Sequence, residues 1–129
     1  MVAKEKDFAS VFSKFTKWLE DNNLKSISPH NYNFTYVTCG DWDLNYMLPA
    51  QCNISKIHVP GHLQHWINVK KAFARSKKGN YPRTLSQMLN ELNMTFEGRQ
   101  HSGIDDVLNI VRIVQTLAKE RHFIFENTN

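Results

Sequence analysis

The sequence has no apolar run that approaches the roughly 20 residues needed by a membrane-spanning helix, and its charged start, residues 1–6, leads directly into an amphipathic pattern. Neither a transmembrane helix nor a secretory signal peptide is therefore expected. Cysteine is scarce, because Cys39 and Cys52 are the only two, and we expect both thiols to be reduced. These features predict a soluble intracellular protein, cytoplasmic or nuclear or both, with no membrane partner.

Glycine and proline are also few, at 5 and 4 of 129 residues, which excludes collagen-like and low-complexity structure. Hydrophobic residues make up 41% of the chain and aromatic residues 12%, as in a packed globular domain. The 16 Lys and Arg against 12 Asp and Glu give a net charge of +4. That excess permits an anionic partner such as nucleic acid but does not identify one.

Local patterns predict the order helix, strand, several helices, strand. Apolar residues recur at three-and-four spacing over residues 7–22, and residues 32–38 are aromatic and β-branched with alternating polarity, so we predict a helix and then a strand. Two strands are few, because a stable sheet normally needs at least three. The remaining predicted elements are a short helix over residues 44–48 that Pro49 closes, a longer helix over residues 63–73, a helix over residues 85–93 with a Thr84–Gln87 capping box, a final helix over residues 104–117 that Ser102 and Asp105 cap, and a strand over residues 122–125.

Two carboxylates, Asp41 and Asp43, follow the first predicted strand at the point where the chain turns into a helix. Ligand crevices in open α/β sheets form at the carboxyl ends of strands. Asp43 could hold a hard divalent cation, since such ions favour oxygen ligands, or it could cap the following helix. Position alone leaves these two interpretations level.

Residues 98–106, at the start of the last predicted helix, contain a second group of polar residues. Helical spacing places Asp106 at the head of an apolar row and Asp105 at the head of a row that we expect to be solvated. The apolar row continues with Ile110, Ile113 and Leu117, and the solvated row with Asn109 and Arg112.

These positions suggest different roles for the two acids. A carboxylate that enters a packed surface needs a cation, a hydrogen-bond network or a metal, so Asp106 is the candidate ligand, whereas Asp105 complements the helix dipole. His101 lies just outside the helix, where its imidazole could accept a proton from water near Asp106. A loop histidine taken singly is a weak signal.

The segments Gly-Asp-Trp-Asp-Leu, residues 40–44, and His-Ser-Gly-Ile-Asp-Asp, residues 101–106, closely resemble the second and third motifs of the DEDDh 3′-to-5′ exonucleases. Among these enzymes, the resemblance is to the enhanced-RNAi and histone-mRNA exonuclease group, which includes the prion-protein-interacting exonuclease. It covers nearly all of the chain in order. The Trp-Ile-Asn stretch, residues 66–68, is more specific to this group than the spacing between His101 and Asp106. Further similar stretches are residues 51–52, 66–73, 85–89 and 97–99.

The resemblance implies an α/β, RNase H-like exonuclease fold with four acids and one histidine around two divalent metal ions, Mg²⁺ or Mn²⁺. It matches Asp43 to the acid of the second motif, Asp106 to the final metal ligand and His101 to the general base. Asp41 is then a bystander. The implied partner is RNA with a single-stranded 3′ end.

The resemblance also suggests two residues at the substrate. Trp42 and Leu44 flank Asp43 and would help to line the pocket of the terminal nucleotide, where stacking on an aromatic ring contributes roughly 1–3 kcal/mol per base. Core packing is an equally good interpretation of Trp42.

One motif of the resembled family is absent. Its opening strand carries an Asp-x-Glu triplet that supplies the other two acids, and this sequence contains no such triplet. We therefore expect residues 1–129 to form the C-terminal portion of a single exonuclease domain that is truncated at its N-terminal strands. The low count of predicted strands agrees with this expectation.

A basic stretch could hold a phosphate backbone or could be a solvated surface. We assign Lys70 and Lys71 to substrate binding. The other positive residues of the stretch are Arg75, Lys77, Lys78 and Arg83.

Three functions remain open at this point. The first is a 3′-to-5′ exoribonuclease that trims single-stranded RNA 3′ ends by two-metal hydrolysis. The second is a truncated, catalytically incompetent product that binds nucleic acid or regulates, and the third is a DNA-directed exonuclease of the same fold, since fold does not fix substrate. We expect the chain alone to be inactive, because it supplies two of the four acids.

Overall fold

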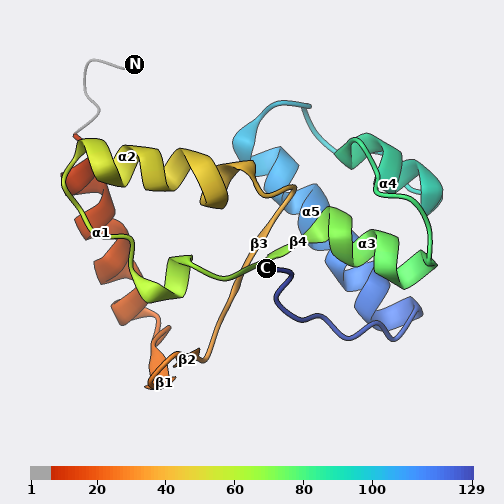
Figure 1. Ribbon diagram of the computed structural model, residues 1–129. Helices are drawn as coiled ribbons and strands as arrows, with labels where there is room; N and C mark the ends of the chain where they lie inside the picture. Colours follow the sequence, from red (N-terminus) through yellow and green to blue (C-terminus); the bar gives the residue numbers. More distant parts are fainter. Residues whose placement is uncertain (1–6) are drawn as a thin grey trace. The chain divides into compact units, whose positions relative to one another are not determined.

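The computed structural model describes residues 7–129, which form two compact units (Figure 1). Unit 1 contains residues 7–36 and 42–65, and unit 2 contains residues 37–41 and 66–129. No helix in the described range combines the length and the apolar character that crossing a bilayer would require.

Unit 1 begins with helix α1, Phe8–Asp21, close to the predicted bounds. Asp7 caps the helix, since its Oδ1 atom accepts a hydrogen bond from the Ser10 amide at 2.8 Å. The aromatic residues of the predicted stripe stack on one another along the helix: Phe8 on Phe12, and Phe15 on Trp18. The three-and-four periodicity therefore predicted both the helix and the face that carries its aromatic rings.

The strand predicted over residues 32–38 is present only at its ends. Strands β1, Ser26–Ser28, and β2, Asn31–Tyr32, form an antiparallel pair, and β3 is Tyr36–Thr38. Asn33 interrupts the expected strand because its side chain accepts from the Lys25 amide at 2.8 Å and donates to the Asn23 carbonyl at 2.7 Å. Such side-chain bonds to nearby backbone compete with a strand ladder.

The prediction that Pro49 closes a short helix was wrong. Residues Asp43–Met47 form a π-helical turn, in which the Leu48 amide donates to the Asp43 carbonyl, and helix α2, Leu48–Ile54, continues from it. Pro49 lies in the first turn of α2, where a missing amide hydrogen costs little.

The long helix predicted over residues 63–73 was also wrong. The structure has a 3₁₀ turn, Gly61–Leu63, then strand β4, Trp66–Asn68, and only then helix α3, Val69–Lys77. Residues 66–69 are consecutive and all at most 5% exposed, a pattern that suits a strand better than a one-sided helix. Asn68 starts α3 by accepting the Lys70 amide at 2.9 Å.

Unit 2 is built around three helices: α3, α4, Leu85–Glu91, and α5, Gly103–Glu120. Both α3 and α4 lie beside α5 (Figure 1). Strand β3 pairs with β4 in a two-stranded sheet. The core consists of six residues that are at most 1% exposed: Val69, Phe73, Met88, Leu89, Ile113 and Leu117.

The predicted capping of α4 is confirmed in part. Thr84 Oγ1 accepts from the Gln87 amide at 3.0 Å, but Gln87 Oε1 accepts from the Arg83 amide, not from that of Thr84. For α5, Ser102 occupies the N-cap position without a capping bond from its side chain.

The strand predicted over residues 122–125 is absent, since these residues have no regular structure. Phe123 and Phe125 pack against the core instead. The chain end then runs along β4. The Thr128 amide donates to the Trp66 carbonyl at 2.9 Å, and the backbone amide of Trp66 donates to Asn129 Oδ1 at 3.0 Å.

One side of α5 stays open to solvent. Val107 and Leu108 are both 52% exposed and Val111 is 41% exposed. Short strands offer a helix little surface to pack on.

Candidate functional site

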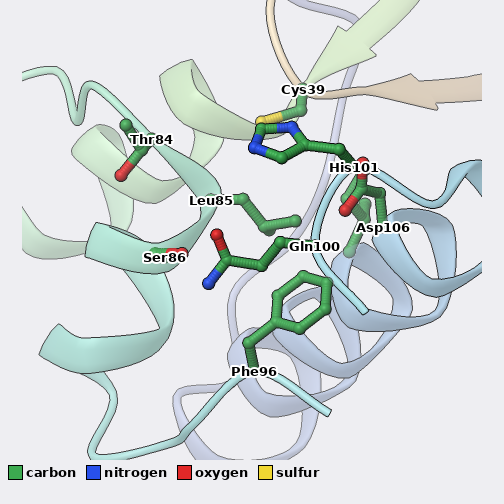
Figure 2. Close-up of a pocket in the computed structure, with 9 residues that line it drawn as sticks. Cys39, Thr84, Leu85, Ser86, Phe96, Gln100, His101 and Asp106 are labelled. Atoms are coloured by element: carbon green, nitrogen blue, oxygen red, sulfur yellow. The ribbon is translucent and has the colours of Figure 1, made fainter. Parts of the chain in front are cut away.

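A pocket of about 400 Å³ lies in unit 2, at the start of α5. Figure 2 shows His101 and Asp106 on one side of it, and Leu85 and Ser86 of α4 on the other. The further lining residues are Cys39, Thr84, Phe96, Gln100 and Ile110. Two of the three predicted catalytic residues thus line one cavity.

His101 reaches the pocket from the turn that precedes α5. Its side chain is exposed, and its backbone has a φ of 67°, in the left-handed region. That conformation costs a non-glycine residue roughly 1–2 kcal/mol. Backbone strain of this kind persists only where the surrounding structure enforces it.

Asp106 lies in the first turn of α5 and is partly buried. Its amide donates to the Ser102 carbonyl at 2.9 Å, which places the residue firmly in the helix. The predicted apolar row below it is confirmed, because Ile110 lines the pocket and Ile113 and Leu117 are fully buried.

The row headed by Asp105 is not solvated as predicted. Asn109 is 0% exposed and the side chain of Arg112 is 24% exposed. Polar side chains were expected to face solvent, whereas Asn109 is buried and Arg112 is partly buried, and both bond to the segment that leads to His101. The recurrence of polar residues at positions 105, 109 and 112 was the pattern from which a bonded polar face could have been predicted.

Asp43 lies in unit 1, as the exposed first residue of the π-helical turn, whereas His101 and Asp106 lie in unit 2. Trp42 precedes the helix and offers no side-chain capping bond, so Asp43 is a first-turn residue and the alternative that it caps the helix is wrong.

The aromatic neighbour of Asp43 is not core. Trp42 is 62% exposed, and its ring lies 5.1 Å from that of Tyr46, which is 57% exposed. Core packing therefore does not account for Trp42, and Leu44 beside it is partly buried.

Asp41 has a structural role in unit 2. Its Oδ1 atom accepts from Trp66 Nε1 at 2.9 Å, and its Oδ2 atom lies 2.9 Å from Lys71 Nζ. Partial burial raises the pKa of Asp41, but the hydrogen bonds from Trp66 and Lys71 and the charge of Lys71 outweigh it and hold the pKa below its ordinary value.

The basic stretch is largely paired within the chain. Lys70 Nζ donates to the Arg83 carbonyl at 2.7 Å, and Lys71 pairs with Asp41. Both ammonium groups that were predicted to bind substrate therefore already have partners within the chain. The other ion pairs are Arg75 with Glu126 at 2.7 Å and Lys77 with Glu91 at 3.3 Å. These contacts favour the solvated-surface interpretation of the stretch.

Carboxylates are the donors that a hard cation prefers, so Asp43 and Asp106 fit the predicted metal in type. They do not fit it in number, because no group of three or more His, Cys, Asp or Glu within residues 7–129 is arranged to hold an ion. These residues by themselves do not form a site for two cations.

Sequence reasoning missed several lining residues of the pocket. Phe96, Gln100 and Cys39 come from a loop, a turn and the residue after β3, and no local pattern connects them. Leu85 was predicted only as the start of a helix. Folding brings these side chains together because β3, α4 and α5 all meet at one end of unit 2.

Comparison with known proteins shows consistent similarity to exonucleases. Mouse ERI1 exoribonuclease 3 is 39% identical over 135 residues, covering 100% of this chain and 37% of the mouse protein. Human 3′-5′ exoribonuclease 1 is 32% identical over 114 residues, covering 88% of this chain and 32% of its own length. The chain thus spans about a third of the curated relatives that it matches.

Solved structures of exonucleases are also similar to this chain. The nuclease domain of 3′hExo, described as a DEDDh family member bound to rAMP, matches with a TM-score of 0.89 and 28% identity, over 99% of this chain and 62% of that one. A structure of 3′-exonuclease in 3′-end specific recognition of a histone mRNA stem-loop matches with a TM-score of 0.83 and 28% identity, over 92% of this chain and 40% of that one. The α/β exonuclease fold expected from the sequence is confirmed.

A family model described as Exonuclease, RNase T, matches residues 1–114. The match extends through the segment that carries Asp43 and the one that carries His101 and Asp106. The chain is therefore a member of the RNase T exonuclease family.

Proposed function

We propose that this chain supplies part of the active site of a 3′-to-5′ exoribonuclease that trims single-stranded RNA 3′ ends. The observation that carries the proposal is the pocket in which His101 and Asp106 meet. Membership of the exonuclease family supports the reaction class, and the exoribonuclease names of the relatives support RNA as the substrate.

The proposed reaction is hydrolysis of the terminal phosphodiester. The oxygen of a water molecule attacks the phosphorus, the bond from phosphorus to the 3′ oxygen breaks, and a nucleoside 5′-monophosphate leaves a chain that is one residue shorter. His101 accepts a proton from the water. General-base catalysis of this kind raises a reaction rate roughly 10²- to 10⁴-fold. Its exposed imidazole at the pocket is accessible to such a water.

The proposed cofactor is Mg²⁺ or Mn²⁺, with Asp43 and Asp106 each contributing carboxylate oxygens. Such ions would stabilise charge on the phosphate and the leaving oxygen. The described residues fall short of a full set of ligands, so these two aspartates would supply part of the coordination.

The proposed contacts to the RNA are at Trp42 and Leu44. Trp42 offers an exposed indole on which a base could stack. Lys70 and Lys71 would contact phosphates only by leaving their present partners, the Arg83 carbonyl and Asp41.

The test uses a domain in which residues 1–129 follow a segment that bears the Asp-x-Glu strand. It measures Mg²⁺-dependent shortening of a 3′-tailed RNA. We expect Asp43→Asn, His101→Ala and Asp106→Asn each to reduce the rate by at least about 100-fold. Asp105→Asn is the matched control and should retain most activity.

Each alternative has its own outcome in this assay. Trimming that is unaffected by Asp106→Asn would contradict the ligand assignment. Faster digestion of a single-stranded DNA of the same sequence would favour the DNA-directed exonuclease. RNA binding without cleavage, even with the Asp-x-Glu segment present, would favour the non-catalytic nucleic-acid-binding function.

A further inference from the structure

The turn that carries His101 is fastened to α5 by a row of three polar side chains. Asp105, Asn109 and Arg112 are separated by four and three residues, so they share one face of the helix. We call them the α5 polar row. Each bonds to the backbone of residues 95–99, the segment that leads to His101.

Asn109 is the centre of the row and is 0% exposed. Its Oδ1 atom accepts from the Glu97 amide at 3.1 Å and from Arg112 Nη1 at 2.7 Å. Its Nδ2 atom donates to the Glu97 carbonyl at 2.8 Å and to the Asp105 carbonyl at 2.7 Å. The carboxamide thus uses both donors and both acceptor positions, and it fixes both backbone groups of Glu97.

The other two members fasten the ends of the segment. Arg112 Nη1 donates to the Thr95 carbonyl at 2.8 Å, and its Nη2 atom lies 3.1 Å from the Glu97 carboxylate. Asp105 Oδ2 accepts from the Arg99 amide at 3.0 Å. The segment is therefore held at Thr95, Glu97 and Arg99, every second residue.

Two backbone features show why such fastening is needed. Gly98, between two of the anchored residues, has a φ of 96°, and a Cβ atom there would lie 2.7 Å from Asp105 Cγ. His101 follows with its own left-handed φ of 67°. Glycine adopts such a φ without strain, whereas His101 does not, and a strained backbone relaxes unless surrounding bonds enforce it.

We propose that the α5 polar row positions His101 for catalysis, by enforcing the turn at Gly98 and the left-handed backbone of His101. The row does not line the pocket, so its members are positioning residues that act through the backbone of residues 95–100. This role in catalysis rests on the proposed exoribonuclease function. The effect of the row on the geometry of the turn can be measured independently of that function.

The first measurement is NMR on the chain itself. Asp105→Ala removes the acceptor of the Arg99 amide, whereas Asp105→Asn keeps an oxygen in the same place. We expect Asp105→Ala to speed exchange of the Arg99 amide proton by about threefold to tenfold, the range implied by one net hydrogen bond. The ring signals of His101 should broaden or split, and Asp105→Asn should restore them.

A control separates positioning from general loss of stability. Ile113→Val weakens the core of α5 without touching the row, and we expect it to leave the His101 ring signals unchanged. Asn109→Ala should speed exchange of the Glu97 amide more than Ile113→Val does. If Asn109→Ala fails to fold because Asn109 is fully buried, the Asp105 pair still decides the matter.

The second measurement uses the domain that carries the Asp-x-Glu strand. Asp105→Ala should lower kcat by about tenfold to 100-fold, as for a misplaced catalytic group, with KM changed less than twofold and Asp105→Asn close to the parent. His101 signals that are identical in Asp105→Ala and in the parent would overturn the proposal. Disturbed signals in a protein that trims no RNA would contradict the proposed function and leave the positioning of the turn intact.

Discussion

Trp66 Nε1 donates a hydrogen bond of 2.9 Å to Asp41 Oδ1, and this bond fixes an acidic residue two positions before the candidate ligand Asp43. The indole is 4% exposed, so its donor has little access to water as a substitute partner. The two aspartates of the Gly-Asp-Trp-Asp segment thus differ in role: Asp41 is bonded inside unit 2, and Asp43 is exposed in unit 1.

The first prediction concerns the stability of unit 2. Asp41→Ala leaves the Trp66 donor without its acceptor and should lower the free energy of unfolding by about 1–3 kcal/mol. Asp41→Asn keeps an acceptor and loses only the partly exposed pair with Lys71, so it should cost about 1 kcal/mol or less. Urea unfolding followed by tryptophan fluorescence measures both, and equal losses would contradict the role of the Trp66 bond.

The lowered pKa of Asp41 also predicts that unit 2 loses stability at acid pH. Its pKa is lowered in the folded state, because its hydrogen bonds to Trp66 and Lys71 and the charge of Lys71 outweigh its desolvation. The stabilisation is present above the unfolded pKa of about 3.9 and is lost as pH falls through the folded value. Asp41→Asn should flatten this part of the stability curve below about pH 4, and a curve that keeps its slope would contradict the assignment.

The second prediction concerns the pH dependence of unit 1. The Tyr36 hydroxyl and His62 Nδ1 lie 2.8 Å apart, and the rings of Tyr32 and Phe34 lie beside the imidazole. Burial lowers the pKa of His62 and raises that of Tyr36 to about 12. The unfolded chain therefore binds the His62 proton more readily, and unit 1 should lose stability as pH falls below about 6.5.

Unfolding experiments at pH 7.5 and 5.5 can test this dependence. His62→Gln keeps a partner for the Tyr36 hydroxyl but cannot titrate, so the stability difference between the two pH values should shrink. His30 lies in the exposed turn between β1 and β2, and His30→Gln is the matched control. A difference that shrinks equally in both variants would show that His62 is not the responsible group.

The third prediction compares two glycines near the pocket. Gly98→Ala places a Cβ atom 2.7 Å from Asp105 Cγ at a φ of 96°, so it should displace the carboxylate and cost about 1–3 kcal/mol. Gly103→Ala meets nothing within 4 Å at the start of α5 and should be neutral or stabilising by up to about 1 kcal/mol. Thermal unfolding of both variants provides the measurement, and a Gly98→Ala protein as stable as the parent would contradict the tight approach of Asp105.

The fourth prediction concerns residues 1–129 tested alone. Asp43 and Asp106 are the two acids matched to the exonuclease motifs, and two carboxylates should hold at most one Mg²⁺ weakly, because that ion demands near-octahedral oxygen coordination. We therefore expect negligible trimming of a 3′-tailed RNA by this chain, and activity once an Asp-x-Glu segment is joined to it. Robust trimming by the 129 residues that disappears in Asp43→Asn would contradict the expectation.

Helices α1, α4 and α5 and the burial of the row below Asp106 could be predicted from local sequence, because helical periodicity and capping need no distant partner. The motif resemblance likewise led to the exonuclease family. It placed His101 and Asp106 as a pair, and the structure brings both to one pocket.

The positions of buried polar residues and short strands depend instead on long-range contacts. Residues 66–68 became a strand because both faces are covered, and Asn109 became a buried anchor because the backbone of Glu97 satisfies it. The absence of a strand over residues 122–125 has the same origin, since Phe123 and Phe125 pack on the core formed by α3, α4 and α5. Each outcome depends on a partner that is distant in sequence, and a buried polar group or a strand edge is stable only when that partner is in place.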